Sequence, residues 1–404
     1  MSPGGAGVRR YAELAVAPSV LRVGLPSVLA RLPLGMTTLA LLLEVHQSSG
    51  SFGLAGGTTA LFALGNGVSS PVRGRLVDRL GAAPVLVATG LLHPVALLAL
   101  VVATRRTGLE FGVLAAAATA GFVLPPVGPI VRAVWQRLPD RGLRESAFSL
   151  DAVIMQAIFY AVGPPAVTLL SVVASPSLAL YVIAALTFCG ALTVASAPAV
   201  QAWPVPQHRP ALLGALAVPG LPMVLLIAVT STTAIGAVEV AVTAFAAEHA
   251  VGDYSGVLLA ALGLGSVTGG LFHGTRTWRP SLAAQYRWWL GALAVGLVPL
   301  GAAPGPASLG WLLFVAGLAI GPASTVQFSL IGALAPSGSL TEAFTWLVAA
   351  SFAGNALGNA VGGSVAQIGG ARAALLLSAA VSVCAVVLSV LGCARLDRAL
   401  SYEN

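Results

Sequence analysis

The sequence has few charges and no lysine. Charged residues make up 8% of its 404 positions, against about 25% in an average soluble domain, whereas 57% of the residues are apolar. A water-soluble protein of this size would need more polar surface to cover its core, so the composition predicts an integral membrane protein. Because all 20 basic residues are arginine, the chain has neither a Walker A ATPase site nor a lysine Schiff base.

The signs of metal sites, enzymes and nucleic-acid-binding proteins are missing too. Cys189, Cys384 and Cys393 lie in apolar segments, and their spacing fits neither a metal site nor a disulfide framework. The motifs H-E-x-x-H, G-x-S-x-G and C-x-x-C do not occur. Membrane topology explains the net charge of +7 better than nucleic acid does. We therefore expect no enzymatic activity, no cofactor, no metal and no nucleic-acid partner.

Unbroken apolar runs, bounded by charges, glycine and proline, predict membrane-spanning α-helices. At roughly 20 residues per span the chain has room for about a dozen. The predicted spans are 19–43, 52–72, 83–103, 109–132, 147–172, 177–197, 221–247, 254–275, 286–303, 309–335, 342–366 and 371–393.

The arginines fall mostly on one side of these spans. If the N-terminus is cytoplasmic, that side receives sixteen of them, and the outside receives only Arg105, Arg106 and Arg372. Positively charged loops stay in the cytoplasm, so both termini are expected there. We expect a multi-pass protein of the bacterial inner (plasma) membrane that is monomeric in the lipid bilayer.

An internal repeat is visible at one fixed offset of 196 residues. Two six-helix halves in the same orientation are typical of one class of secondary transporters. The repeat predicts halves at 1–197 and 221–404 with a cytoplasmic linker at 198–220, and Pro26 and Pro126 superposed on Pro222 and Pro322. The matches are Gly24-Leu25-Pro26 with Gly220-Leu221-Pro222, Gly67, Ser70 and Gly74 with Gly263, Ser266 and Gly270, Ala120, Gly121 and Pro126 with Ala316, Gly317 and Pro322, and Ala147-Phe148 with Ala343-Phe344.

The most specific motif follows the second predicted helix and reads Gly74-Arg75-Leu76-Val77-Asp78-Arg79-Leu80-Gly81. Its glycines permit close backbone approach or positive φ, and Asp78 can accept hydrogen bonds from a helix N-terminus or pair with arginine. Here the sequence resembles the major facilitator superfamily, whose signature G-x-L-a-D-r-x-G-r-k is matched at Gly74, Leu76, Asp78, Arg79 and Gly81. Ala82-Ala83 stand where the signature has its final basic pair.

The resemblance implies two pseudo-symmetric six-helix bundles, with the first, fourth, seventh and tenth helices around a central substrate path. Gly74, Asp78, Arg79 and Gly81 are then expected to act in gating. We expect Asp78 to contact the other half near Thr341–Ala343 when the cavity faces outward.

Prolines mark the fourth helix, which contains Pro125-Pro126-Val127-Gly128-Pro129. Three prolines must break or kink it. Arg132 follows and is included with the gating residues. It is expected either to pair with Asp78 or Glu145 at the inner gate or to serve as a positive-inside anchor.

Glycines mark the fifth and eleventh helices. The fifth contains Gly163-Pro164-Pro165, and the eleventh contains Gly354-x-x-x-Gly358-Asn359-x-x-Gly362-Gly363. The second pattern resembles an efflux signature of the family, displaced to the other half. The alternative is that these glycines only allow close helix packing.

Ionisable residues inside predicted helices are the main functional candidates, since each costs a few kcal/mol at the bilayer centre. We expect Glu239 to be the main proton-coupling carboxylate, with Arg31 as its cation. Asp151 and Glu44 are the further proton-coupling candidates. The substrate-cavity candidates are Arg31, His93, Gln156, Asn355 and Asn359, although helix packing remains an alternative for His93 and the amides.

These features predict a secondary transporter that exports a small amphipathic compound by alternating access. Because the chain lacks an ATPase motif, a gradient must drive it, most simply of protons. The alternatives are uptake of a small solute and a non-transporting membrane sensor or scaffold with the same fold. The charges at Arg31 and Glu239 favour transport, since a scaffold would gain stability by losing them.

Overall fold

The computed structural model describes residues 18–106, 108–203, 214–249, 255–276, 278–336 and 338–401. Every regular element in these ranges is a helix, and nine stretches of them are long and apolar enough to cross a membrane. The predicted fold class, an all-α membrane protein, is therefore confirmed.

The first half contains six helical segments at the places of the six predicted spans, and the fourth and fifth segments are interrupted. They are α2 (Pro18–Ser49), α3 (Phe52–Leu80), α4 (Ala82–Thr104), α5 (Glu110–Phe122) with α6 (Val127–Gln136), α7 (Arg141–Gln156) with the π-helix η1 (Ala157–Val162) and α8 (Gly163–Val173), and α9 (Pro176–Ala195). In the linker the structure describes α10 (Pro198–Gln201) and η2 (Gly214–Ala217), and residues 204–213 lie outside the described part.

The second half repeats this order. Its elements are α11 (Leu221–Glu248), α12 (Ser255–Gly274), α13 (Leu282–Leu297) with η4 (Val298–Ala302), α14 (Pro306–Gly317) with α15 (Ile320–Leu334), and α16 (Leu340–Ser401). The last contains two predicted spans, which meet at a kink where Gly370 has a φ of 76°. Such a positive φ favours glycine because a Cβ would clash with the backbone.

The fourth span is broken where the prolines predict a break, between α5 and α6. Its repeat partner is interrupted at the corresponding place, between α14 and α15. Gly121 and Gly317 lie just before these breaks, where each backbone touches a neighbouring helix, α3 and α12 respectively, too closely for a Cβ. Pro26 and Pro222 thus lie in the first span of their halves, and Pro126 and Pro322 lie in the fourth.

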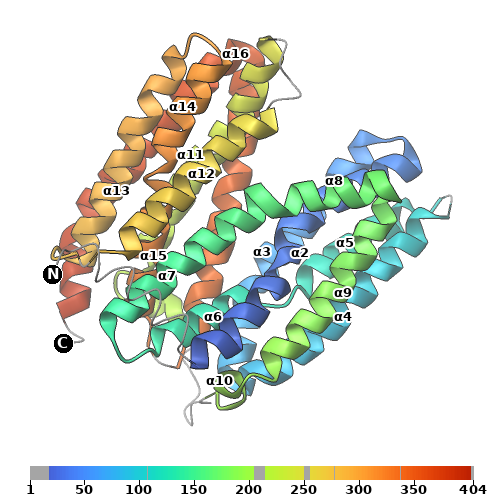
Figure 1. Ribbon diagram of the computed structural model, residues 1–404, viewed down its shortest axis with the longest axis horizontal. Helices are drawn as coiled ribbons and strands as arrows, with labels where there is room; N and C mark the ends of the chain where they lie inside the picture. Colours follow the sequence, from blue (N-terminus) through green and yellow to red (C-terminus); the bar gives the residue numbers. More distant parts are fainter. Residues whose placement is uncertain are drawn as a thin grey trace.

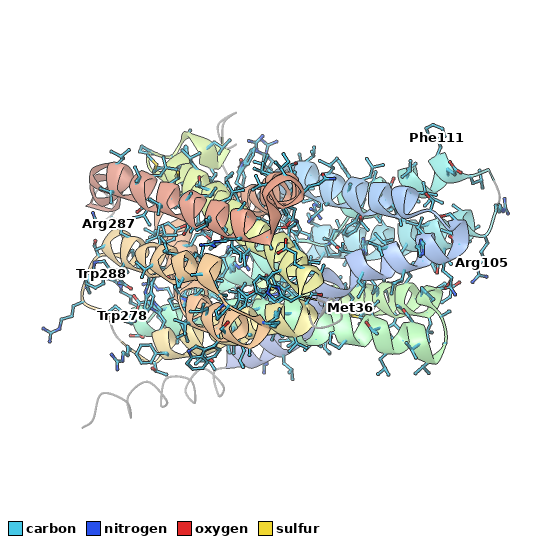
Figure 2. The ribbon with its side chains drawn as sticks, turned by 90° about the horizontal axis from the view of Figure 1, so that it is seen from above. Met36, Arg105, Phe111, Trp278, Arg287 and Trp288 are labelled. Carbon is cyan, nitrogen blue, oxygen red and sulfur yellow. The ribbon has the colours of Figure 1, made fainter. Side chains whose placement is uncertain are left out.

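The two bundles meet at one end and diverge from it. In Figure 1 they come together around α6, α7 and α15, while α8 and α14 point away from each other. We call the meeting end, which carries Asp78 and Glu342, the inner end, because the arginine distribution predicts that it faces the cytoplasm. Figure 2 shows Arg105 and Phe111 at one end of the molecule and Trp278 and Arg287 at the other.

The buried side chains also show that the two bundles meet at one end and separate elsewhere. One cluster of buried side chains joins both halves, and in it Phe148 of α7 packs against Phe328 of α15 and Phe344 of α16 with ring centroids 6.3 and 6.1 Å apart. Two other clusters each belong to a single half. The halves therefore share a core at the inner end and have separate cores elsewhere.

Candidate functional site

Two adjoining cavities lie between the halves. The first, of about 210 Å³, is lined from the first half by Asn66, Ser70, Arg73 and Arg132 and from the second by residues that include Phe328. The second, of about 220 Å³, shares part of this lining and also contacts Gln156 and Tyr160. A space enclosed by both halves is where alternating access places a substrate.

A buried ion cluster lies beside these cavities, within the first half. Asp151 of α7 binds Arg31 of α2 through Oδ1 and Arg132 of α6 through Oδ2, the latter at 2.8 Å. All three side chains are buried. The guanidinium of Arg132 also lies 3.9 Å from the ring centroid of Phe328 in the second half, in a cation–π contact.

This cluster corrects two expectations. Arg132 pairs with Asp151 and not with Asp78 or Glu145, since Glu145 instead binds Arg141 at 3.1 Å. Arg31 pairs with Asp151 and not with Glu239. Both arginines face the aspartate because α2, α6 and α7 pack together inside one bundle. Arg31 lines a separate cavity of about 180 Å³ with Trp135 and Asp151.

Glu239 lies on α11 in a polar chain that crosses between the halves. Its Oε1 accepts a hydrogen bond from the hydroxyl of Tyr160 at 2.8 Å, and its Oε2 accepts one from Asn355 Nδ2 at 3.3 Å. Asn359 in turn donates to Asn355 at 3.1 Å. Tyr160 lies in the π-helix η1, a distortion that is frequent at functional sites. Within this series of hydrogen bonds, the bond between Tyr160 and Glu239 is the one that joins the two bundles.

Of the predicted cavity residues, Gln156 lines the second cavity. Asn355 and Asn359 belong to the Glu239 chain. His93 is fully buried between α4 and α5, with its Nδ1 2.8 Å from the carbonyl oxygen of Ala120. It is not among the residues that line the two cavities, so its contacts are those of a packed helix pair.

Glu44 has a similar internal position. Its carboxylate accepts hydrogen bonds from Thr104 at 3.0 Å and Ser177 at 2.7 Å. These contacts link α2, α4 and α9 of the first half, with the Glu44 side chain buried. The hydrogen-bond partners of Glu44 therefore connect helices within one bundle.

The inner end is closed by the motif at Gly74–Gly81. The carboxylate of Asp78 accepts hydrogen bonds from the backbone N–H groups of Thr341 and Glu342, at 3.2 and 2.8 Å, in the first turn of α16. Arg75 Nε donates to Glu342 Oε1 at 2.8 Å. The predicted contact of Asp78 near Thr341–Ala343 is thus present. A helix N-terminus attracts a carboxylate because its N–H groups are unpaired and its dipole is positive.

The other residues of the motif, Gly74, Gly81 and Arg79, have different surroundings. Gly74 lies against Glu342 and Thr345 without space for a Cβ, so a larger residue would separate α3 from α16. Gly81 ends α3 with a φ of 91°. Arg79 is exposed, and its side chain makes no hydrogen bond or ion pair with any described residue across the seal.

The repeat places a second contact opposite the first. Gly270 of α12 is the counterpart of Gly74, and its carbonyl oxygen accepts a hydrogen bond from Ser149 of α7. Ser149 is the counterpart of Thr345, which adjoins Gly74. Ser146 also donates to the carbonyl oxygen of Gly274 at 3.1 Å. We call the two contacts together the inner seal. Only its α3–α16 side carries the charged groups of Asp78, Arg75 and Glu342.

Asp78 lies beyond the predicted span 52–72, at the inner end of α3. Burial raises the pKa of Asp78 to about 6, and the hydrogen bonds from Glu342 and Thr341 oppose this rise. Loss of hydration disfavours the charged form more than the hydrogen bonds favour it. Keeping the Asp78 carboxylate charged inside the seal therefore costs free energy.

Sequence reasoning missed Arg73 and Glu342 as site residues. Arg73 directly follows the predicted span 52–72, so it counts among the sixteen arginines on the predicted cytoplasmic side, but α3 continues to Leu80. A helical side chain points back toward the helix N-terminus, and Arg73 Nη2 reaches Asn66, two turns earlier, at 2.6 Å from Oδ1. The seven-residue spacing of Asn66 and Arg73 on one helical face was the available signal.

At the level of sequence, no family model and no curated protein matches the chain. Solved structures do match. A bacterial homologue of the iron transporter ferroportin, in an outward-facing state, has a TM-score of 0.77 at 14% identity and covers 93% of this chain and 100% of its own. The human organic anion transporter MFSD10 (TETRAN) has a TM-score of 0.70 at 17% identity, covering 92% and 99%.

The E. coli fucose:proton symporter FucP matches with a TM-score of 0.69 at 14% identity, covering 93% of this chain and 98% of its own. A structure of FucP in the outward conformation, described as a major facilitator superfamily transporter, matches with a TM-score of 0.67 at 15% identity, covering 93% and 99%. This chain has the major facilitator fold. At such identities the likeness concerns the fold alone, so the function has to be argued from the site.

Proposed function

We propose that this protein is a secondary transporter of the bacterial inner membrane that exports a small amphipathic compound in exchange for protons. The observation that carries the proposal is a pair of cavities between two bundles whose inner ends are sealed by breakable polar contacts. Such a seal closes one side while the halves diverge toward the other. Rocking of the bundles about the cavities then gives alternating access.

Glu239 is the proposed proton-coupling group. Its carboxylate holds the Tyr160 hydroxyl across the boundary between the halves, so adding a proton to it changes the strength of that bridge. Asp151, the other candidate, is held between two guanidinium groups. Releasing it to take up a proton requires breaking two ion pairs, which favours Glu239.

The proposal is tested with purified protein in lipid vesicles that contain a pH-sensitive dye. Compounds are first chosen by their ability to raise the melting temperature of the protein. Adding such a compound outside should raise the internal pH, because the compound enters as protons leave. Vesicles without protein provide the control.

The same assay separates the alternatives. FucP is described as a symporter, and symport would lower the internal pH when the compound enters. A compound that stabilises the protein and produces no flux under any gradient would indicate a sensor or scaffold and contradict the proposal.

A further inference from the structure

We propose that the substrate is an amphipathic organic anion, and that Arg73 binds its oxyanion group in the first cavity. The inference rests on the proposed function and adds the chemical class of the substrate. It begins from an arginine that is almost fully buried, at 4% exposure, and that lines the cavity between the halves.

Arg73 has no acidic partner within the part of the chain that the structure describes. Its Nη2 donates to the backbone oxygen and to Oδ1 of Asn66, at 3.1 and 2.6 Å. Its Nε and Nη1 have no acceptor among the described residues. A buried charged donor without an acceptor is strongly unfavourable. A guanidinium presents its N–H groups as a planar fork, which matches the two oxygens of a carboxylate.

The surrounding charges also favour an anion. Arg132 lines the same cavity, and Asp151 is the single carboxylate shared by Arg132 and Arg31. Three arginines beside one aspartate leave an excess of positive charge on the first-half side. Neither cavity has an aspartate or glutamate among its described lining residues, and Glu239 reaches the second cavity only through its bond to Tyr160.

The remaining lining predicts the apolar part of the substrate. Phe159, Phe328 and Phe352 contribute aromatic surface to the first cavity, and Phe159 and Phe328 continue into the second. Together the two spaces fall within the roughly 300–1,000 Å³ of small-molecule sites. An anion whose charged end lies at Arg73 and whose ring lies between these phenylalanines fits both features.

The test compares two compounds of the same shape, 2-naphthoate and its uncharged amide, 2-naphthamide. Their affinities are measured by thermal stabilisation of the purified protein in a neutral detergent at pH 7.5. The wild type should bind the carboxylate about tenfold or more tightly than the amide, as expected for a hydrogen bond to a charged group. Equal affinity, or no binding of 2-naphthoate, overturns the proposal.

The location is tested with Arg73→Gln, which should bind both compounds equally weakly. Arg22→Gln removes one exposed charge from α2 and should retain the wild-type preference. If Arg73→Gln does not fold, Ser351→Phe serves instead, because it fills both cavities without touching a charge and should abolish 2-naphthoate binding. A retained preference for 2-naphthoate in Arg73→Gln, or retained 2-naphthoate binding in Ser351→Phe, contradicts the assignment.

A further arm adds short-chain phosphatidylglycerol. Stabilisation by this lipid and not by 2-naphthoate would assign the arginine to a lipid headgroup and overturn the proposal. Binding and transport are also separable. If 2-naphthoate binds through Arg73 but is never moved across vesicles, the anion site stands and the transporter proposal fails.

Discussion

At the residue scale, the membrane-embedded charges have different roles that their sequence positions do not reveal. Asp151, Arg31 and Arg132 form one internal cluster, whereas Glu239 bonds across the halves. Sequence reasoning identified these residues because charges inside apolar runs are conspicuous. It did not pair them correctly, since the partners are brought together by helix rotation and packing, which composition does not encode.

The ion cluster predicts a large stability effect for Asp151→Asn. This change leaves Arg31 and Arg132 buried without a countercharge, and breaking a buried pair in this way typically costs about 3–5 kcal/mol. Glu145→Gln is the matched control, because its partner Arg141 is exposed and such pairs contribute at most about 1 kcal/mol. Thermal unfolding in detergent should show a large fall for the first variant only. Equal, small effects would mean that the cluster relaxes or binds another anion.

Glu239→Gln tests proton coupling. Glutamine keeps the shape of the side chain and an acceptor for Tyr160, but it cannot titrate. The variant should exchange substrate across vesicles without driving it uphill on a pH gradient. Tyr160→Phe keeps the titrating carboxylate but removes the bridge through which it acts, so it should weaken coupling as well. Uphill transport at a near-normal rate by Glu239→Gln would make Glu239 structural and Asp151 the next candidate.

At the element scale, the predicted spans correspond to helices, because apolar length is a strong signal. The deviations are local. The π-helix η1 and the two further turns of α3 place Tyr160 and Arg73 at the cavities, and neither feature follows from hydrophobicity. A π-helix depends on how the chain packs before Gly163, which lies against Gly35 of α2 too closely for a Cβ.

The glycine pattern of the eleventh span has a packing role in the structure. Gly354, Gly358 and Gly362 each lie against α11, which is the alternative to an efflux signature. Gly358→Ala should destabilise the protein by roughly 1–3 kcal/mol, as overpacking does, because a Cβ there meets the carbonyl oxygen of Thr233.

Gly363→Ala is the control from the same motif, since its Cβ would have only an ordinary contact, 3.8 Å from Val240. Thermal unfolding compares the two variants, and transport is measured per folded protein. A normally stable Gly358→Ala protein that has lost transport would restore the functional interpretation of the motif.

At the scale of the whole molecule, the repeat makes the inner seal symmetric in packing and asymmetric in charge. Gly74 with Thr345 and Gly270 with Ser149 are counterparts, but Asp78 has Gly274 as its counterpart. The offset of 196 residues in the sequence already paired Gly74 with Gly270. The opposing residues could not be paired in advance, because they depend on how one bundle docks on the other.

The last prediction concerns Asp78, which we expect to set how easily the seal opens. In the seal, burial raises the pKa of Asp78 to about 6. When the inner end opens, water reaches the carboxylate and its pKa returns toward the ordinary value of 3.8. A proton therefore binds more tightly to the sealed state. Acidification from pH 7 to 5 should stabilise the seal by about 1.3 kcal/mol, and this stabilisation is lost as the pH rises through about 6.

Asp78→Asn cannot ionise, so its seal at pH 7 should resemble the wild-type seal at pH 5. We expect this variant to fold in normal amount, to transport more slowly and to lose the pH dependence of opening. Spin labels at Arg79 and Pro336, both exposed at the inner end, measure the opening in a protein with its three cysteines replaced. Asp140→Asn is the control, because Asp140 caps α7 within one half, accepting from Leu143 at 2.8 Å. Unchanged flux in Asp78→Asn would show that Asp78 does not control the opening of the inner seal. A wider inner end at pH 7 would show that the hydrogen bonds to α16 outweigh the cost of burying the charge.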